Sequence, residues 1–211
     1  MATNSVPTPI SGGYDDGYRS CPCFWGRVPG SIVQRLFDLL PQGQPVTVLD
    51  AGCGEGKNAA AFAERGHEVM ALDCSAPAIA NGRRAFPHKG ITWENADIAS
   101  FLQQDAKYDV VLAYGLLHCL PDRSAIVQVM SSLMSATKRG GYFVLCSMND
   151  RSQDLSAHPG FSPTLLPHDF YTGKLAEWLI VEASDRDLYE THPHNDIPHS
   201  HSLTRILARK P

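Results

Sequence analysis

The stretch Val48-Leu49-Asp50-Ala51-Gly52-Cys53-Gly54-Glu55-Gly56 decides the fold of this 211-residue chain. The apolar residues that open it predict a short buried strand, and the three glycines predict a tight turn into a helix beginning near Lys57. Glycines let a backbone lie against a ligand where any Cβ would intrude. The next apolar run ends at Asp73, 19 residues after Gly54, where a carboxylate can accept both hydroxyl protons of a ribose. The stretch therefore indicates a nucleotide-binding loop.

The spacing of the loop excludes two common nucleotide motifs. A dinucleotide fingerprint needs a third glycine where this chain has Lys57. A P-loop needs a glycine at the position of Ala51 and a serine or threonine at that of Asn58. What remains is a G-x-G-x-G loop with one acid before it and two acids, Asp73 and Asp97, at the ends of the next two apolar runs.

This constellation resembles the class I S-adenosylmethionine-dependent methyltransferases. The resemblance implies that the glycine loop passes under the methionine part of the cofactor, that Asp73 holds the ribose, and that Asp97 faces the adenine amine with Ile98 beside the ring. The residues expected to bind S-adenosylmethionine are Trp25, Asp50, Gly52, Cys53, Gly54, Gly56, Asp73, Cys74, Asp97, Ile98 and Tyr114.

Hydrophobic periodicity predicts an α/β chain in which strands and helices alternate. Strands are expected at 46–51, 67–72, 91–94, 108–113 and 141–147, and helices at 31–40, 57–65, 76–85 and 122–137. A final pair of strands, about 177–184 and 202–209, completes the architecture that the resemblance implies, a Rossmann-like, doubly wound, mostly parallel seven-stranded sheet with one antiparallel strand near the C-terminus. Ligands bind such sheets beyond the carboxyl ends of the strands.

Length and composition favour a single domain over residues 1–211 that acts on a small molecule. The formal net charge of −4 and the absence of a basic cluster argue against a nucleic-acid partner. The apolar runs are too short for a membrane span, and the first 13 residues do not form a signal peptide, so we expect a cytoplasmic protein. The six cysteines lack the dense framework of a disulfide scaffold.

Three further segments are similar to the tellurite-resistance-type methyltransferases, and this resemblance covers most of residues 14–211. The first is Tyr14-Asp15-Asp16-Gly17-Tyr18 with Phe24-Trp25-Gly26; the second is 52–58 with 64–69; the third is Lys138-Arg139-Gly140-Gly141-Tyr142. The resemblance implies that residues 1–28 cover the cofactor. Trp25 is the lid candidate because an aromatic face attracts a sulfonium, with packing in the core as the alternative.

Histidines concentrate after position 150, and His192-Pro193-His194-Asn195-Asp196-Ile197-Pro198-His199-Ser200-His201 contains two H-x-H pairs. Alternate residues of an extended segment point the same way, so a metal site is one alternative. We favour a solvated polar loop and assign no metal. His192 matches a histidine of the tellurite-type proteins and is the candidate base or positioning group on the acceptor side. Pro193 and Ser200 stand where arginines would recognise an oxyanion, which argues against an anionic acceptor.

Tyr114 and His118 follow the fourth predicted strand, where the resemblance places residues that flank the reacting methyl group. They complete the catalytic candidates together with His192, and the alternative for His118 is a buried structural role. The expected activity is methyl transfer to a small molecule by in-line displacement at the sulfonium. One alternative is intramolecular alkylation of the cofactor, as in azetidine-2-carboxylate synthases, which releases methylthioadenosine. Another is a cofactor- or metal-responsive binding protein.

Overall fold

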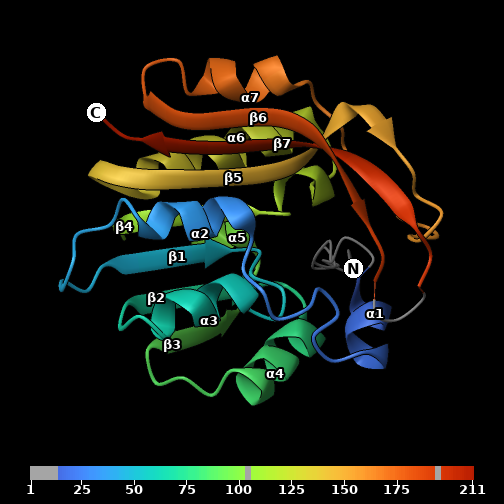
Figure 1. The fold of residues 1–211 in the computed structure, drawn as a ribbon, viewed down its shortest axis with the longest axis horizontal. Coiled ribbons are helices and arrows are strands. Elements are labelled where there is room, and N and C mark those ends of the chain that lie inside the picture. Colours follow the sequence, from blue (N-terminus) through green and yellow to red (C-terminus); the bar gives the residue numbers. More distant parts are fainter. Residues whose placement is uncertain (1–13, 103–105, 193–195) are drawn as a thin grey trace, which may run out of the picture.

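A computed structural model describes residues 14–102, 106–192 and 196–211. Their strands form a single seven-stranded sheet in the order β3-β2-β1-β4-β5-β7-β6, in which β7 alone runs antiparallel to its neighbours (Figure 1). This confirms the predicted Rossmann-like α/β fold. The strand order reverses between β1 and β4, and such a switch point is where open α/β sheets bind their ligands.

The first half of the sheet is built from short parallel strands separated by helices. The strands are β1 (Thr47–Ala51), β2 (Glu68–Asp73), β3 (Ile91–Asn95) and β4 (Tyr108–Tyr114), and the helices are α2 (Ser31–Phe37), α3 (Lys57–Ala63), α4 (Ala76–Ala85) and the one-turn α5 (Ile98–Phe101). Side chains cap two of these helices: Ser75 Oγ accepts from Ala78 N at 3.2 Å, and Asp97 Oδ1 accepts from Ala99 N at 3.0 Å. The predicted bounds of these strands and of α2, α3 and α4 are confirmed to within a few residues, whereas α5 was not predicted.

The second half of the sheet has much longer strands. After the 3₁₀ turn η1 (Leu117–Cys119) and α6 (Arg123–Ala136) come β5 (Thr137–Gln153), α7 (His168–Lys174), β6 (Leu179–Glu190) and β7 (His199–Arg209). All three strands run past the ends expected from the sequence. The prediction of a polar loop up to His201 is wrong, because residues 199–201 are the first residues of β7 and pair with β6 on one side. The start of β7 was not predicted because its residues are Ser and His, which do not form an apolar run.

Helices cover both faces of the sheet. Apolar side chains of α2 and α3 pack against β1, β2 and β4 on one face, and those of α6 and α7 pack against β4, β5 and β7 on the other. The short helix α1 (Asp15–Ser20), which the periodicity did not predict, lies at the carboxyl end of the parallel strands, beside the far ends of β6 and β7 (Figure 1). Among the described residues, no helix combines the length and apolarity needed to cross a membrane.

Candidate active site

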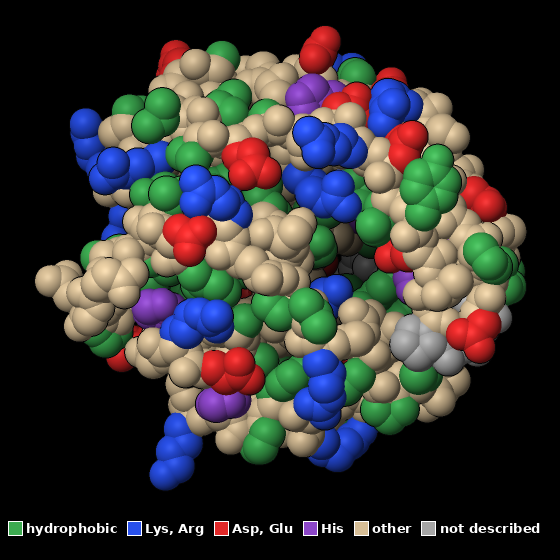
Figure 2. Space-filling view, viewed as in Figure 1, with side chains coloured by type: hydrophobic (Ala, Val, Ile, Leu, Met, Phe, Trp, Pro, Cys, Tyr) green, Lys and Arg blue, Asp and Glu red, His purple; other side chains and the backbone are tan. Residues whose placement is uncertain are grey.

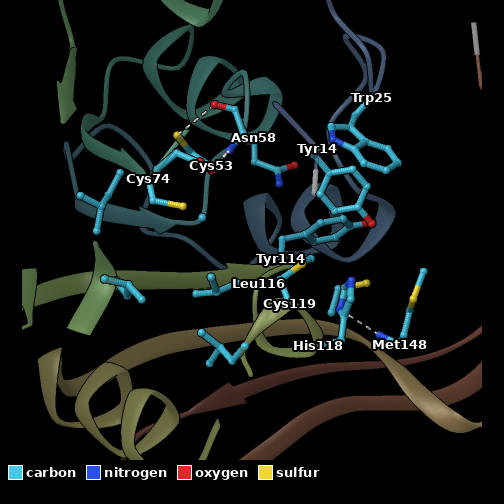
Figure 3. Close-up of a pocket in the computed structure, with 18 of the residues that line it drawn as sticks. Tyr14, Trp25, Cys53, Asn58, Cys74, Tyr114, Leu116, His118, Cys119 and Met148 are labelled. Carbon is cyan, nitrogen blue, oxygen red and sulfur yellow. Dashed lines mark hydrogen bonds between the residues drawn. The ribbon is translucent and has the colours of Figure 1, made fainter. Parts of the chain in front are cut away.

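A cavity of about 400 Å³ opens at the carboxyl ends of the parallel strands. Its wall combines the glycine loop after β1, Asp73 at the end of β2, Asp97 after β3 and Tyr114 at the end of β4. Figure 3 shows Tyr14 and Trp25 on one side of this cavity, with Tyr114, His118 and Met148 facing them from the other. The topology therefore brings the residues predicted from separate motifs into one enclosed space.

Two glycines of the loop allow close packing around this cavity. Gly54 and Gly56 both have positive φ values, +55° and +82°. A Cβ on Gly54 would lie 2.9 Å from the hydroxyl of Tyr18, and one on Gly56 would lie 2.3 Å from the ring of Trp93. The loop could not pass between α1 and β3 with side chains at these positions.

Asp73 is anchored as a hydrogen-bond acceptor at the cavity wall. Its Oδ2 accepts from Gly54 N at 2.7 Å, and its Oδ1 accepts from Ser75 N at 2.8 Å. Burial raises the pKa of this carboxyl, while the two backbone hydrogen bonds oppose that rise. A carboxylate has about four acceptor positions, so Asp73 retains capacity for the two hydroxyl groups of a ribose.

Asp50 is the penultimate residue of β1, directly before the loop, and is 1% exposed. Its Oδ2 accepts from Ala59 N at 3.0 Å, whereas its Oδ1 is buried without a hydrogen-bond partner among the described residues. Burial raises the pKa of Asp50 to about 7. The side chain does not line the cavity, so it shapes the loop from below.

The polar residues of the loop hold the N-terminal segment in place. Glu55 Oε1 accepts from Cys23 N at 2.9 Å, and its Oε2 accepts from Phe24 N at 2.5 Å. Lys57 Nζ donates to the carbonyl of Trp25 at 3.0 Å. The Oδ1 of Asn58 accepts from Gly30 N at 3.0 Å. Loop and covering segment therefore form one hydrogen-bonded unit, a role for these side chains that the sequence analysis missed.

Aromatic rings of this segment close the cavity. Trp25 Nε1 donates to Tyr18 Oη at 3.0 Å, and the Trp25 ring packs edge-on against Tyr14 and Phe24, with centroids 5.1 and 4.8 Å apart. Trp25 lines the cavity and also joins a small apolar cluster with Tyr18 and Phe24. The packing alternative for this tryptophan describes its contacts, and its role as a lid stays a prediction.

His118 and Tyr114 both face the cavity in their neutral forms. The backbone N–H of Met148 donates to His118 Nδ1 at 3.2 Å, which places the ring proton on Nε2. Burial, with His201 and His158 nearby, lowers the pKa of His118 to about 3. Burial likewise raises the pKa of Tyr114. Near neutral pH, both side chains can donate a hydrogen bond and neither carries a charge.

His192 lies beside the cavity and does not line it. It is 3% exposed, and its Nε2 lies 3.3 Å from Nε2 of His158. The expectation of solvated histidines is wrong, since His158, His199 and His201 are at most 6% exposed as well. His194 and Pro193 fall outside the described residues. His158 lies in the segment after β5. No sequence pattern around it predicted that it would lie next to His192.

Most of the predicted cofactor-binding residues line the cavity, and Asp50 is the exception. The lining members are Trp25, Gly52, Cys53, Gly54, Gly56, Asp73, Cys74, Asp97, Ile98 and Tyr114. Residues that the sequence analysis did not select, above all Tyr14, Met148 and Glu190, complete the wall. Glu190 comes from the end of β6, which was expected to stop six residues earlier.

Comparison with known proteins finds similarity in the middle of the chain. Residues 48–141 match the family model described as "Methyltransferase domain". The 2-heptyl-1-hydroxyquinolin-4(1H)-one methyltransferase of Mycobacteroides abscessus is 32% identical over 126 residues, 56% of each chain. The tRNA 5-carboxymethoxyuridine methyltransferase of Escherichia coli K12 is 34% identical over 114 residues, 50% of this chain and 41% of the relative. The matched regions thus span about half the length of these curated relatives.

A solved structure extends the likeness over most of the fold. TehB from Haemophilus influenzae superimposes with a TM-score of 0.72 and 18% identity, covering 87% of this chain and 63% of that protein. The likeness at this identity concerns the fold, and it agrees with the seven-stranded order found here. Residues 48–141 are therefore similar to a methyltransferase domain, and this region contains the glycine loop, Asp73 and Asp97.

Proposed function

We propose that the protein transfers a methyl group from S-adenosylmethionine to a small molecule held in this cavity. The observation that carries the proposal is that one enclosed space joins the glycine loop and Asp73 to Tyr114 and His118. The first pair suits the cofactor, and the second pair lies on the side where an acceptor would enter. The cavity volume falls in the range of small-molecule sites.

Several features of the loop fit the cofactor. The remaining acceptor capacity of Asp73 suits the ribose hydroxyls, and Asp97 with Ile98 would border the adenine. The rings of Tyr14 and Trp25 would face the sulfonium, which aromatic faces attract. When bound, S-adenosylmethionine supplies an electrophilic methyl group. The chain supplies alignment and exclusion of water through its aromatic cover.

On the acceptor side, we assign hydrogen-bond donation to His118 and Tyr114. A neutral His118 whose Nδ1 already accepts from Met148 N can offer only its Nε2–H toward the cavity. Such a donor orients an oxygen, nitrogen or sulfur atom of the acceptor and does not remove its proton. This arrangement favours acceptors that ionise readily, for which positioning is the main requirement.

A small acceptor fits the surface better than a nucleic acid does. The face in Figure 2 carries Lys and Arg interspersed with Asp and Glu, without a basic stripe, and the net charge is −4. Binding a nucleic-acid backbone requires clustered positive charge. One relative is named for a small-molecule substrate, a quinolone, and its match covers 56% of this chain. The other is named for a tRNA substrate, and its match covers 50%.

Product analysis tests the reaction. Purified protein is incubated with S-adenosylmethionine alone and then with pools of small thiols, amines, phenols and chalcogen oxyanions, and products are read by mass spectrometry. We expect S-adenosylhomocysteine together with a methylated acceptor in at least one pool. Methylthioadenosine formed without any acceptor would instead support cyclisation of the cofactor. Failure to bind S-adenosylhomocysteine in calorimetry would overturn the cofactor assignment.

A further inference from the structure

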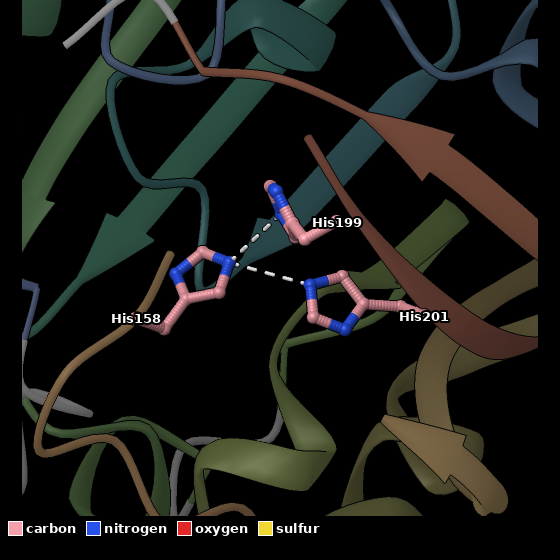
Figure 4. Close-up of side chains that lie close together, drawn as sticks. All are labelled: His158, His199 and His201. Atoms are coloured by element: carbon pink, nitrogen blue, oxygen red, sulfur yellow. Dashed lines mark hydrogen bonds between the residues drawn. The ribbon is translucent and has the colours of Figure 1, made fainter. Parts of the chain in front are cut away.

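Four buried imidazoles converge at one point beside the cavity. Nε2 of His158 lies 3.2 Å from Nε2 of His199, and 3.3 Å from Nε2 of both His192 and His201. Figure 4 shows three of these rings turned toward one another, with dashed lines from His158 to both His199 and His201. Nε2 of His199 also lies 3.9 Å from Oε1 of Glu190. These five residues are called the histidine cluster below.

Hydrogen bonding alone cannot account for this convergence. The Nε2 atom of an imidazole offers one in-plane direction, either a lone pair or an N–H. His158 Nε2 can therefore make one good hydrogen bond with another ring, yet three ring nitrogens approach it at 3.2–3.3 Å. At least two of these buried contacts would therefore lack a well-directed hydrogen bond, which is costly. A cation among the nitrogens removes that conflict.

The outer hydrogen bonds turn two lone pairs inward. His199 Nδ1 lies 2.8 Å from the carbonyl oxygen of Ile197, which only accepts, so Nδ1 carries the proton. His201 Nδ1 lies 3.0 Å from Oε1 of Gln153. The amide of Gln153 donates its own hydrogens to the carbonyls of Asn149 and Ser202 at 2.7 and 2.9 Å, which fixes its oxygen toward His201.

With the protons on Nδ1, the Nε2 atoms of neutral His199 and His201 present lone pairs to the centre of the cluster. Metal-binding histidines are oriented in this way by carbonyl or carboxylate acceptors behind them. The spacing agrees too, because four nitrogens about 2.0–2.1 Å from a tetrahedral zinc ion lie about 3.3–3.4 Å apart. The three separations from His158 Nε2, 3.2–3.3 Å, are close to that edge length.

We propose that His158, His192, His199 and His201 bind a divalent transition-metal ion, for which Zn²⁺ is the best fit, with Glu190 available as a further oxygen ligand. Imidazole donors suit zinc, nickel and copper, and the absence of a thiolate among these four ligands disfavours softer ions. The proposal does not depend on methyl transfer, since it rests on the ring positions alone.

The position of the histidine cluster would place the ion at the edge of the cavity. His158 and His201 line the cavity, so the ion would lie in its wall on the side of β7. The rings of Trp25 and Phe24 stack on His158 and His192, with centroids 6.1 and 5.9 Å apart. The ion would therefore join the ends of β6 and β7, the segment after β5 and the aromatic cover of the cavity.

Metal analysis of the full chain, purified without a polyhistidine tag, tests the proposal. The protein is stripped with a chelator, reloaded with zinc and dialysed, and its metal content is measured by mass spectrometry. We expect one ion per chain and a higher melting temperature after loading. Stoichiometric nickel, iron or copper in the protein as isolated would support the site and change the ion. Less than about 0.2 ion per chain in every preparation, roughly an adventitious level, would overturn it.

Matched variants locate the ion. His201→Ala and His158→Ala should each lower zinc affinity by more than the roughly 10- to 100-fold typical of lost outer hydrogen bonds. His88→Ala, at a half-exposed histidine outside the cluster, should bind zinc as the parent does. Equal zinc content in all three would place the ion elsewhere and contradict the proposal. Circular dichroism of the stripped proteins separates ligand loss from misfolding.

The hydrogen bond between His201 Nδ1 and Gln153 Oε1 allows a second test, which distinguishes orientation of a metal ligand from a purely structural role of Gln153. Gln153→Glu keeps an acceptor behind His201, whereas Gln153→Leu removes it. We expect about 10- to 100-fold weaker zinc binding for the leucine variant and a smaller change for the glutamate variant. Binding of S-adenosylhomocysteine, measured on the same samples, reports on the cofactor site separately. Equal zinc affinity of the two variants would contradict the assigned orientation of His201.

Discussion

The two halves of the sheet build their sites in opposite ways. On the side of β1–β3, short parallel strands each lead by a short turn into a helix, and the loop 52–56 with Asp73 supplies the polar contacts. On the side of β5–β7, long strands bring together histidines from three separate segments of the chain. The first site is encoded by local spacing, while the second exists only once strand register is set. Their sensitivities to mutation should differ accordingly.

The largest effect is expected where the loop holds the N-terminal segment. Glu55→Ala removes the acceptor of Cys23 N, Phe24 N and the amide of Asn81. Stranding buried donors should lower the free energy of unfolding by about 3–5 kcal/mol. Chemical denaturation measures this loss, and hydrogen exchange should rise in residues 14–26. Exchange that rises uniformly over the chain would mean that loop and cover do not form a separate unit.

Asp50 should make stability depend on pH on the loop side. Because burial raises its pKa to about 7, the folded state holds a proton that the unfolded state releases near pH 4. The contribution of Asp50 to the free energy of unfolding is fully present below about pH 4. It falls by up to about 1.4 kcal/mol per pH unit as the pH rises to 7. The wild type minus Asp50→Asn difference in unfolding free energy, measured without cofactor, should trace this fall of about 2–4 kcal/mol. A flat difference would show that Asp50 stays charged.

Asp73 tests the independence of the two halves most directly. Asp73→Ala removes a charge-assisted contact worth about 1.5–3 kcal/mol, which corresponds to roughly 10- to 100-fold weaker binding of S-adenosylhomocysteine. His201→Ala should weaken that affinity less, since His201 lines the cavity on the side of β7 and not at the glycine loop. Isothermal calorimetry on both variants decides the matter. A reversed ranking would place the cofactor against the histidine side.

The smallest effect is expected at the aromatic cover that touches both halves. Trp25→Phe loses the hydrogen bond to Tyr18 but keeps a ring, so stability should fall by about 0.5–1.5 kcal/mol with cofactor affinity retained. Trp25→Ala loses the ring as well and should weaken cofactor affinity and turnover together. Thermal unfolding and calorimetry of the pair separate packing from closure. Equal affinities for the two variants would show that the ring does not cover the cofactor.

The same contrast explains how far the sequence predicted the molecule. The glycine loop, the acids and the alternating strands are local patterns, and the structure confirms the fold they predict. A metal site among residues 192–201 was only an alternative, and His158 could not be added to it because His158 and His201 are 43 residues apart and neither lies in an apolar run. The contacts of Glu55 were missed for a related reason: a loop carboxylate looks solvated until a segment 31 residues earlier packs on it.

The pairing of β7 has a consequence for how this chain can change over time. Its register places His199 opposite Glu190 and His201 opposite both Leu188 and Gln153. Because side chains alternate across a strand, a slip by one residue would send both histidines to the opposite face. A single-codon insertion or deletion at the start of β7 is therefore far more damaging than most substitutions there. Natural variation in length should be confined to the connections outside these strands.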